Sequence, residues 1–171
     1  MAEFLNPEKI LKELKLKNNL IAADFGCGSG GWVIPLSKIL FRGKIFAIDI
    51  LEEPLSVLRS KLKKEKIYNV ELRRADVEEK VPLLPESVDL VLMTNLLFEC
   101  ENKEKVLEEA KRILKKGGKI LIVDWKEEAA DIGPERKVSI EEIKKIAKKL
   151  ELKVEREFEA GSFHFGLILV K

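Results

Sequence analysis

The sequence predicts an α/β fold, namely a doubly wound, mostly parallel sheet with helices on both faces. Short apolar runs typical of buried strands alternate with stretches whose apolar residues recur at helical spacing, the pattern of a parallel sheet covered by helices. The first apolar run, residues 20–25, passes directly into a glycine-rich turn. The last two runs have only a short turn between them, so we expect a closing antiparallel hairpin.

The first half of the chain contains the elements expected around the glycine-rich turn. A helix should begin at Asn6-Pro7-Glu8, which offers a capping side chain, a proline at the first helical position and an acid in the first turn. Residues 20–25 should form a strand buried on both faces, and a helix should begin at about Gly31. A second strand is expected at 44–50, with Pro54 opening the next helix.

The second half continues the alternation. Further strands are expected at 69–74, 88–93 and 119–123. Lys115–Gly118 should close the helix before the last of these, because it places basic residues and then glycine at a helix carboxyl end. Residues 126–137 lack periodicity and should form a loop, and Ser139 with Glu142 makes a capping box for the final helix. The expected hairpin strands are 152–158 and 163–170.

Length and composition limit the classes of function. We expect the 171 residues to form one domain, in which residues 1–18 are a helical segment that covers the site. The net charge of +2 argues against nucleic acid or an anionic membrane as partner. We find no secretory signal and no membrane span, and therefore expect a soluble cytoplasmic protein. The oligomeric state is not indicated.

The residue types also argue against metal chemistry. Cys27, Cys100 and His164 are the only cysteines and histidine, too few for a Cys/His metal centre or a disulfide framework, so no metal site is expected. Lysine and glutamate dominate the charged residues and glutamine is absent, a bias that resembles proteins from hot environments, so we expect a thermophilic source.

The glycine-rich turn is the strongest functional signal. Gly26, Gly28 and Gly30 allow a tight turn and a close backbone approach to a ligand, and the helix after them directs its first amide groups toward whatever lies over the turn. A nucleotide-like ligand fits such a place. Gly26, Gly28 and Gly31 also match the GxGxxG spacing of dinucleotide-binding folds, and the alternative is an ordinary strand-to-helix turn.

Polar residues follow each predicted parallel strand. Ligands of such sheets bind at the carboxyl ends of the strands, near the point where strand order reverses. The residues at these ends are Asp24, Asp49, Asp76, Asn95 and Asp124. We therefore expect the site at this edge, although Asp49 has the alternative of only capping a helix and Asp76 of only holding a turn.

With these residues, the chain resembles the class I S-adenosylmethionine-dependent methyltransferases, over nearly its whole length. Asp24 to Gly30, reading DFGCGSG, fits the first motif of that family, and Asp49 fits the acid that closes the second strand. Further segments fit the later motifs: Ala75-Asp76-Val77, Val88-Asp89 to Asn95, and Leu114 to Gly118. Asp124-Trp125, Gly133-Pro134 and Phe163 to Gly166 look most like small members of the ubiquinone/menaquinone-biosynthesis type.

The resemblance implies a fold, a cofactor and roles for the motif residues. The sheet would have seven strands in the order 3-2-1-4-5-7-6, with strand 7 antiparallel, and the cofactor would be S-adenosylmethionine. Gly26, Gly28 and Gly30, with Cys27 between them, would let the backbone reach its methionine part, and Asp24 would orient its ammonium group. Asp49, beside Ile50, would accept from the ribose hydroxyls. The remaining contacts would come from Asp76 and Val77 at the adenine and from Asn95 and Leu96 at the methionine and the transferring methyl.

The acceptor is expected to be a small molecule. Residues 95–98 read NLLF and lack the prolines of the related enzymes that methylate nucleic-acid amines, and the cysteines needed for arsenic methylation are missing. An apolar acceptor would suit Phe4, Trp125, Phe163 and Phe165, although core packing explains Phe165 equally well. His164 is the candidate base, with Asp124 and Glu99 as substitutes, while a packed histidine is the alternative. Two other functions stay open, namely an NAD-dependent oxidoreductase and a non-catalytic cofactor-binding subunit.

Overall fold

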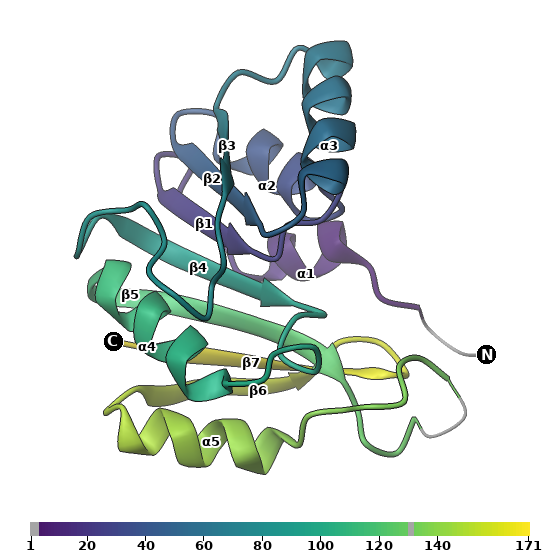
Figure 1. Cartoon of the computed structure of the whole chain (residues 1–171), viewed down its shortest axis with the longest axis vertical. Helices are drawn as coiled ribbons and strands as arrows, with labels where there is room; N and C mark the ends of the chain where they lie inside the picture. The colour runs from purple at the N-terminus through teal and green to yellow at the C-terminus, as the bar shows by residue number, and fades with distance from the viewer. Residues whose placement is uncertain (1–3, 130–131) are drawn as a thin grey trace.

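The computed structural model describes residues 4–129 and 132–171, which contain a seven-stranded sheet flanked by five helices (Figure 1). The elements in chain order are α1 Pro7–Glu13, β1 Ile21–Phe25, α2 Val33–Ile39, β2 Lys44–Asp49, α3 Glu52–Glu65, β3 Val70–Arg74, β4 Val88–Thr94, α4 Lys103–Ile113, β5 Leu114–Trp125, α5 Ile140–Lys149, β6 Lys153–Glu159 and β7 His164–Val170.

The strand order is β3-β2-β1-β4-β5-β7-β6, which confirms the expected order. The strands β1 to β5 run parallel to their neighbours, and β7 lies antiparallel between β5 and β6. The order reverses between β1 and β4, so the glycine-rich turn after β1 lies at the switch point, where ligands bind in such folds.

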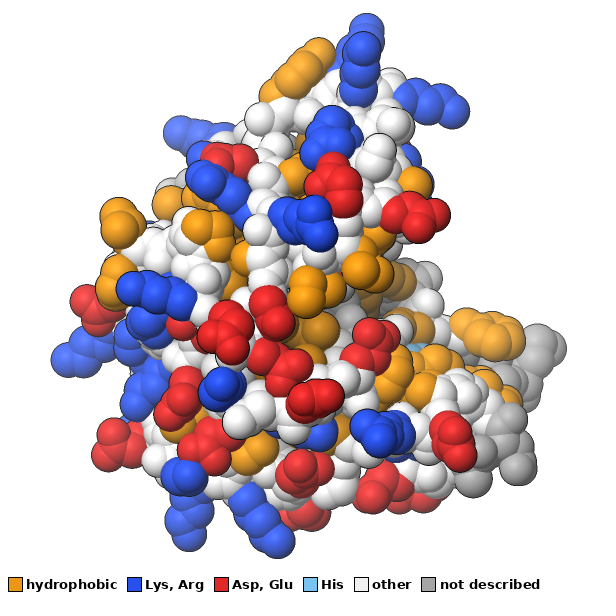
Figure 2. Space-filling model, in the orientation of Figure 1, with side chains coloured by type: hydrophobic (Ala, Val, Ile, Leu, Met, Phe, Trp, Pro, Cys, Tyr) orange, Lys and Arg blue, Asp and Glu red, His pale blue; other side chains and the backbone are white. Residues whose placement is uncertain are grey.

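Two apolar layers sandwich the sheet. On one face α1, α2 and α3 pack against β-strand residues that include Ala22, Ala47 and Leu92. On the other face α4 and α5 cover a layer that includes Phe25 and Met93. Figure 2 shows the face with α4 and α5, on which acidic side chains gather near the middle and basic side chains lie mostly around the periphery.

Most predicted element ends are confirmed to within two residues, and the helix caps explain why. The Asn6 side chain accepts a hydrogen bond from the Lys9 amide at 3.1 Å, and Ser139 Oγ accepts one from the Glu142 amide at 3.0 Å. Each of these bonds satisfies an amide that has no partner within its helix.

Two predicted boundaries are wrong. Pro54 does not open α3, because the helix begins at Glu52 and the proline is its third residue, where no intrahelical amide bond is lost. Lys115–Gly118 does not close α4, because the helix ends at Ile113 with Lys111 and Arg112 as its last basic residues. The chain passes straight into β5 at Leu114, and Lys115–Gly118 pairs with the carboxyl-terminal end of the chain through Gly117, Gly118 and Lys171.

The connection from β3 to β4, residues 75–87, contains no helix. Side chains of α4 supply its hydrogen-bond partners instead. The buried Glu109 accepts from the Val81 amide at 2.7 Å, and Arg112 donates to the carbonyl of Leu83 at 2.9 Å and that of Val81 at 3.2 Å. Glu109 and Arg112 also form an ion pair, so α4 holds the connection against the sheet.

The described part of the chain contains no helix that is both long and apolar enough to cross a membrane. In the same residues no group of three or more His, Cys, Asp or Glu side chains is arranged to hold a metal ion. The predicted loop at 126–137 consists of turns and bends in its described part, while residues 130–131 lie outside it. Of the expected covering segment 1–18, residues 1–3 likewise lie outside the described residues.

Candidate active site

The glycine-rich turn leaves room for a ligand at its middle glycine. Gly26, Gly28 and Gly30 all have positive φ angles, of 69°, 52° and 93°, so the turn requires residues without a side chain. A Cβ atom at Gly28 would meet nothing within 4 Å, whereas one at Gly26 or Gly30 would collide with Leu96 or Leu58. The outer two glycines therefore serve close packing, and the open space lies at Gly28.

Asp24 is a buried carboxyl group with no partner. It lies at the end of β1, its side chain is fully buried, and neither of its oxygens accepts a hydrogen bond. Burial, and secondarily the nearby Asp49 carboxylate, raises the pKa of Asp24 to about 8. An unpaired buried acid is costly, and a cationic group placed beside it would lower that cost.

Asp49 lies at the end of the neighbouring strand β2 and is tied to the same turn. Its Oδ2 accepts from the Gly28 amide at 2.9 Å, and its Oδ1 accepts from the Leu51 amide at 3.0 Å. Leu51 is the N-cap residue of α3, which has no side-chain capping bond, so Asp49 contacts the residue just before the helix. Each carboxylate oxygen can accept two hydrogen bonds, which leaves capacity for two hydroxyl groups of a ligand.

Asp76 and its neighbours form the next part of the same edge. Asp76 Oδ1 accepts from the Glu78 amide at 2.9 Å, which is the turn contact that short acidic side chains commonly make, and its second oxygen has no such bond. Val77 is buried, while Ile50 after β2 is 52% exposed. The exposed apolar surface of Ile50 beside two carboxylates suits a flat heterocycle.

The residues after β4 close the site from the other side of the switch point. Asn95 has a φ of 49°, and its side-chain Oδ1 is buried without a partner. The backbone N–H of Asn95 donates to the Val123 carbonyl at 2.8 Å, and this bond fixes the start of the loop to β5. Leu96 then lies against Gly26, and Cys27 is buried beneath the turn, where burial raises the pKa of its thiol.

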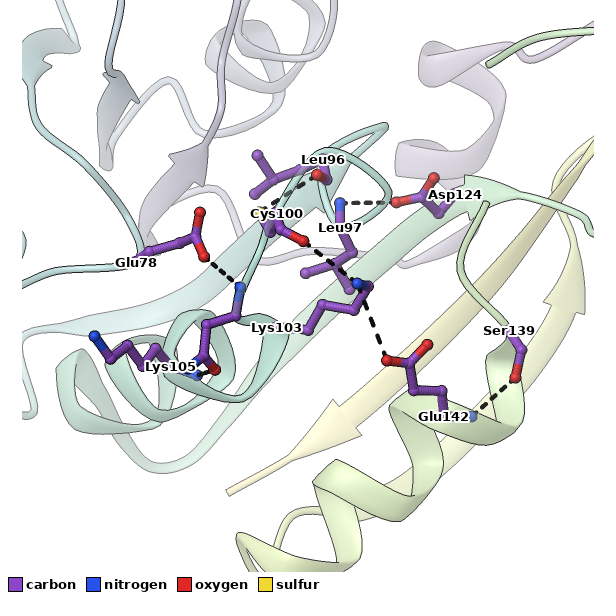
Figure 3. A network of polar contacts seen from close by, with 10 residues as sticks. Glu78, Leu96, Leu97, Cys100, Lys103, Lys105, Asp124, Ser139 and Glu142 are labelled. Carbon is purple, nitrogen blue, oxygen red and sulfur yellow. Dashed lines mark hydrogen bonds and ion pairs between the residues drawn. The ribbon is translucent and has the colours of Figure 1, made fainter. Parts of the chain in front are cut away.

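Asp124 anchors this loop. Its Oδ2 accepts a hydrogen bond from the Leu97 backbone amide at 2.9 Å (Figure 3). Its Oδ1 accepts one from the backbone amide of the next residue, Trp125, at 2.8 Å. Burial raises the pKa of Asp124 to about 6, against the opposing effect of these backbone donors. Through its bond to the Leu97 amide, Asp124 holds the loop after β4 in position.

A polar network fixes the other end of the loop. Lys103, near the start of α4, donates to the Cys100 carbonyl at 3.3 Å and lies 4.0 Å from Glu142 of α5 (Figure 3). Glu78 accepts from the Asn102 amide. The segment 95–102 is therefore held at both ends, by β5 and by the amino termini of α4 and α5.

His164 lies where β7 begins, beside the end of β5. Its side chain is 5% exposed, neither ring nitrogen has a hydrogen-bond partner, and its ring centroid lies 4.1 Å from that of Trp125. Burial, and secondarily the charge of Lys126, lowers the pKa of His164. The imidazole is therefore neutral at neutral pH, with a hydrogen on one ring nitrogen and the other nitrogen free to accept a proton.

The sheet separates the two candidate catalytic residues. His164 pairs with Trp125, and Asp124 pairs with Phe165. Because successive side chains of a strand point to opposite faces, His164 and Asp124 lie on different faces. In β1 the side chain of Asp24 points away from the face of Ala23 and lies on the same face as Ala22, which is the face covered by α1 to α3. Phe165 is 7% exposed and belongs to the opposite core layer, which favours the core-packing alternative for this residue.

Aromatic side chains gather near His164. The rings of Phe4 and Phe163 lie 6.3 Å apart, and Phe4 is 76% exposed. A cavity of about 280 Å³ lies between α1 and the β6–β7 turn, with Phe4, Ile10 and Ala160 among its lining residues. Trp125 packs against Gly133, where a Cβ atom would lie 2.5 Å from the indole ring.

One contact at the turn has no signal in the sequence. Lys61 of α3 donates to the Ser29 carbonyl at 3.0 Å, and so holds the turn from a position 32 residues away. The two positions are far apart in the sequence, so no local pattern connects them.

Comparison with known proteins gives consistent matches. The model of the methyltransferase domain family matches residues 23–122, more than half of the chain. The solved structure of a SAM dependent methyltransferase from Aquifex aeolicus is 36% identical and superposes with a TM-score of 0.90, over 97% of this chain and 89% of that one.

Curated relatives match over about two thirds of the chain. A demethylmenaquinone methyltransferase from Alkalihalophilus pseudofirmus is 30% identical over 67% of this chain and 48% of its own length. The protein of the same name from Staphylococcus aureus is 30% identical over 68% of this chain and 48% of its own. The chain thus spans about half the length of these relatives.

Proposed function

This chain belongs to the class I S-adenosylmethionine-dependent methyltransferase family, and we propose that it transfers a methyl group from S-adenosylmethionine to a small-molecule acceptor. Two features of the turn carry the proposal together. Asp24 is a buried carboxyl without a partner, and the space at Gly28 is open. A ligand that fills this space with a positive charge would satisfy both.

The residues at the sheet edge fit the groups of that cofactor. Its ammonium would be held by Asp24, and its methionine part would lie over Gly28, where the backbone has no side chain in the way. Its ribose hydroxyls would donate to the remaining acceptor sites of Asp49.

The remaining family positions would complete the cofactor site. The adenine would lie between Ile50 and Val77, with its amino group at Asp76. Asn95 and Leu96 would border the methionine and the methyl group, while Gly26, Cys27 and Gly30 form the turn beneath it.

The chain mainly has to align the two reactants. When bound, the cofactor supplies an activated methyl group on a sulfonium. Correct alignment of two reactants can remove about 7–11 kcal/mol of a barrier. Asp124 would contribute by holding the Leu97 amide, and therefore the loop that carries Leu96, in place.

His164 is the proposed base for an acceptor that must lose a proton. It is neutral and buried, neither ring nitrogen has a hydrogen-bond partner, so the unprotonated one can accept a proton, and the side chain shares the sheet face of Asp24. Asp124 is a weaker candidate, because both of its oxygens already accept backbone amides and its side chain lies on the opposite face.

The proposed acceptor is a small apolar molecule with an aromatic ring. Phe4, Phe163 and Trp125 offer aromatic surface beside His164, and demethylmenaquinone is in the name of two relatives. Residues 1–18 would cover this acceptor within a single domain. The near-neutral net charge favours such a molecule over a nucleic acid.

Calorimetry with three ligands separates the candidate functions. We expect the protein to bind S-adenosylmethionine and S-adenosylhomocysteine with a stoichiometry of one and to take up no NADH. Uptake of NADH alone would instead support an oxidoreductase. A protein that binds S-adenosylhomocysteine, yet transfers no label from tritiated cofactor to any compound of a cell extract or to demethylmenaquinone, would be a non-catalytic subunit.

A further inference from the structure

A second concave site lies at the opposite edge of the sheet. It is a groove of about 640 Å³ at the amino ends of β1, β4 and β5, on the face that carries α1 to α3. Such a volume is typical of small-molecule sites. Leu20 lies at the groove and Asp24 at the candidate active site, about 13 Å away along the strand. The two sites are therefore separate.

The floor and one wall of the groove are apolar. The floor consists of Leu90, Leu121 and Ile168, whose side chains project from three strands of the sheet and are at least 95% buried. Half-buried leucines of the segment after α1 form the wall, namely Leu14, Leu16 and Leu20. Of the residues that line the groove, Glu13 is the one that belongs to a helix, so the groove lies between the segment after α1 and the sheet.

The rim of the groove carries an excess of positive charge. Six basic side chains and three carboxylates line it. Each carboxylate is paired with one of the basic groups: Asp89 with Lys115 at 3.0 Å, Glu155 with Lys119 at 2.8 Å, and Glu13 with Arg156 at 3.9 Å.

The other three cations, Lys15, Lys17 and Lys116, are exposed, and no ion pair within residues 4–129 and 132–171 involves them. The groove therefore combines an apolar floor with a local charge of +3 in a protein whose net charge is only +2.

We propose that this groove binds an amphiphilic anion, a single molecule with an apolar chain or ring system and one carboxylate or phosphate group. The apolar part lies on Leu90, Leu121 and Ile168, and the anionic group lies among Lys15, Lys17 and Lys116. A bilayer surface fits less well, because the apolar residues form a recessed floor that a flat membrane does not reach. The inference is independent of the proposed function.

Dodecanoate, kept below its micelle concentration, is the probe that tests the site. We expect calorimetry to show one molecule bound per chain, with an affinity that falls at least tenfold when salt rises from 50 to 500 mM, because the three lysines are exposed and therefore screened. Dodecanol, which has the same chain without the charge, should bind at least tenfold more weakly. Equal binding of the two probes, or no binding of dodecanoate, overturns the proposal.

A matched pair of variants locates the site. Reversing two rim charges in K17E/K116E should weaken dodecanoate binding at least tenfold. The control, K63E/K64E, makes the same change in net charge on exposed positions of α3 and should leave binding unchanged. All of these lysines are exposed, so circular dichroism should show both variants folded. Equal effects of the two variants contradict the assignment.

Two further measurements distinguish other occupants. Saturation with S-adenosylhomocysteine should leave dodecanoate binding intact, since the sites lie at opposite ends of β1; competition between them refutes a separate site. A different result would be that the parent protein cosediments with phosphatidylglycerol vesicles, loses this binding in K17E/K116E, and binds no dodecanoate. That result would identify a membrane surface as the partner and overturn the proposal.

Discussion

Replacing Asp24 by asparagine should stabilise the protein without ligand and weaken its binding of the cofactor. The pKa of this buried carboxyl rises from 3.8 to about 8 in the folded state, mainly through burial. The folded protein therefore holds a proton more tightly than the unfolded chain between about pH 4 and pH 8, and its stability falls as the pH rises through this window. Asparagine does not titrate and avoids the loss.

The magnitude follows from the same pKa values. Each tenfold difference in proton affinity between the folded and unfolded states is worth about 1.4 kcal/mol. The advantage of D24N over the parent protein should therefore grow by about 3 kcal/mol between pH 5 and pH 7, and approach about 6 kcal/mol above pH 8. Urea unfolding of both proteins at pH 5, 6, 7 and 8 measures it, with the exposed Glu101→Gln variant as control.

Ligand binding should respond in the opposite direction. The amide of D24N offers no charge to an ammonium group, and a hydrogen bond to a charged group is worth about 1.5–3 kcal/mol, so S-adenosylhomocysteine should bind about 10–100-fold more weakly. In the parent protein at pH 7, binding should release close to one proton from Asp24, which calorimetry in buffers of different ionisation enthalpy detects. An unchanged affinity together with a pH-independent stability difference would refute this role for Asp24.

Three further changes probe the same edge of the sheet. Gly28→Ala places a side chain in the open space at a φ of 52°; we expect about 1 kcal/mol of lost stability and at least a tenfold loss of S-adenosylhomocysteine affinity, and full binding by calorimetry would contradict the open cradle. Asp124→Ala leaves the Leu97 amide without its acceptor, so urea unfolding should show about 1–3 kcal/mol of lost stability; no loss would mean that the loop is held by its other contacts alone. His164→Ala should lower turnover with little change in S-adenosylhomocysteine affinity. Because the pKa of His164 is lowered, the base stays unprotonated below pH 6.5, and the turnover of the parent protein should persist there. If the His164→Ala variant turns over as fast as the parent protein, His164 has no part in the mechanism.

Local patterns were sufficient to predict the strands and the glycine turn. Apolar runs such as residues 20–25 are long enough to be strands and too short for helices, and three alternating glycines allow few other conformations. The carboxyl edge of a parallel sheet then brings Asp24, Asp49 and Asp76 together whatever the details of their loops. Their binding roles stay predictions.

Features that depend on pairing between distant segments were not predictable from the sequence. The assignment of Asp124 and His164 to opposite faces follows from the register in which Trp125 faces His164. The Lys61 contact to Ser29 depends on how α3 packs over the turn. The groove at the amino ends of β1, β4 and β5 combines five separate parts of the chain whose residues share no motif.

The helix-free connection between β3 and β4 has a consequence for protein engineering. Its amide at Val81 and its carbonyls at Val81 and Leu83 depend on Glu109 and Arg112, side chains that belong to another element. Grafting residues 75–87 into a different scaffold should therefore fail to reproduce their conformation unless that glutamate–arginine pair is grafted with them. Redesign of residues 75–87 in this protein should likewise keep Glu109 and Arg112 unchanged and vary only exposed residues of the connection.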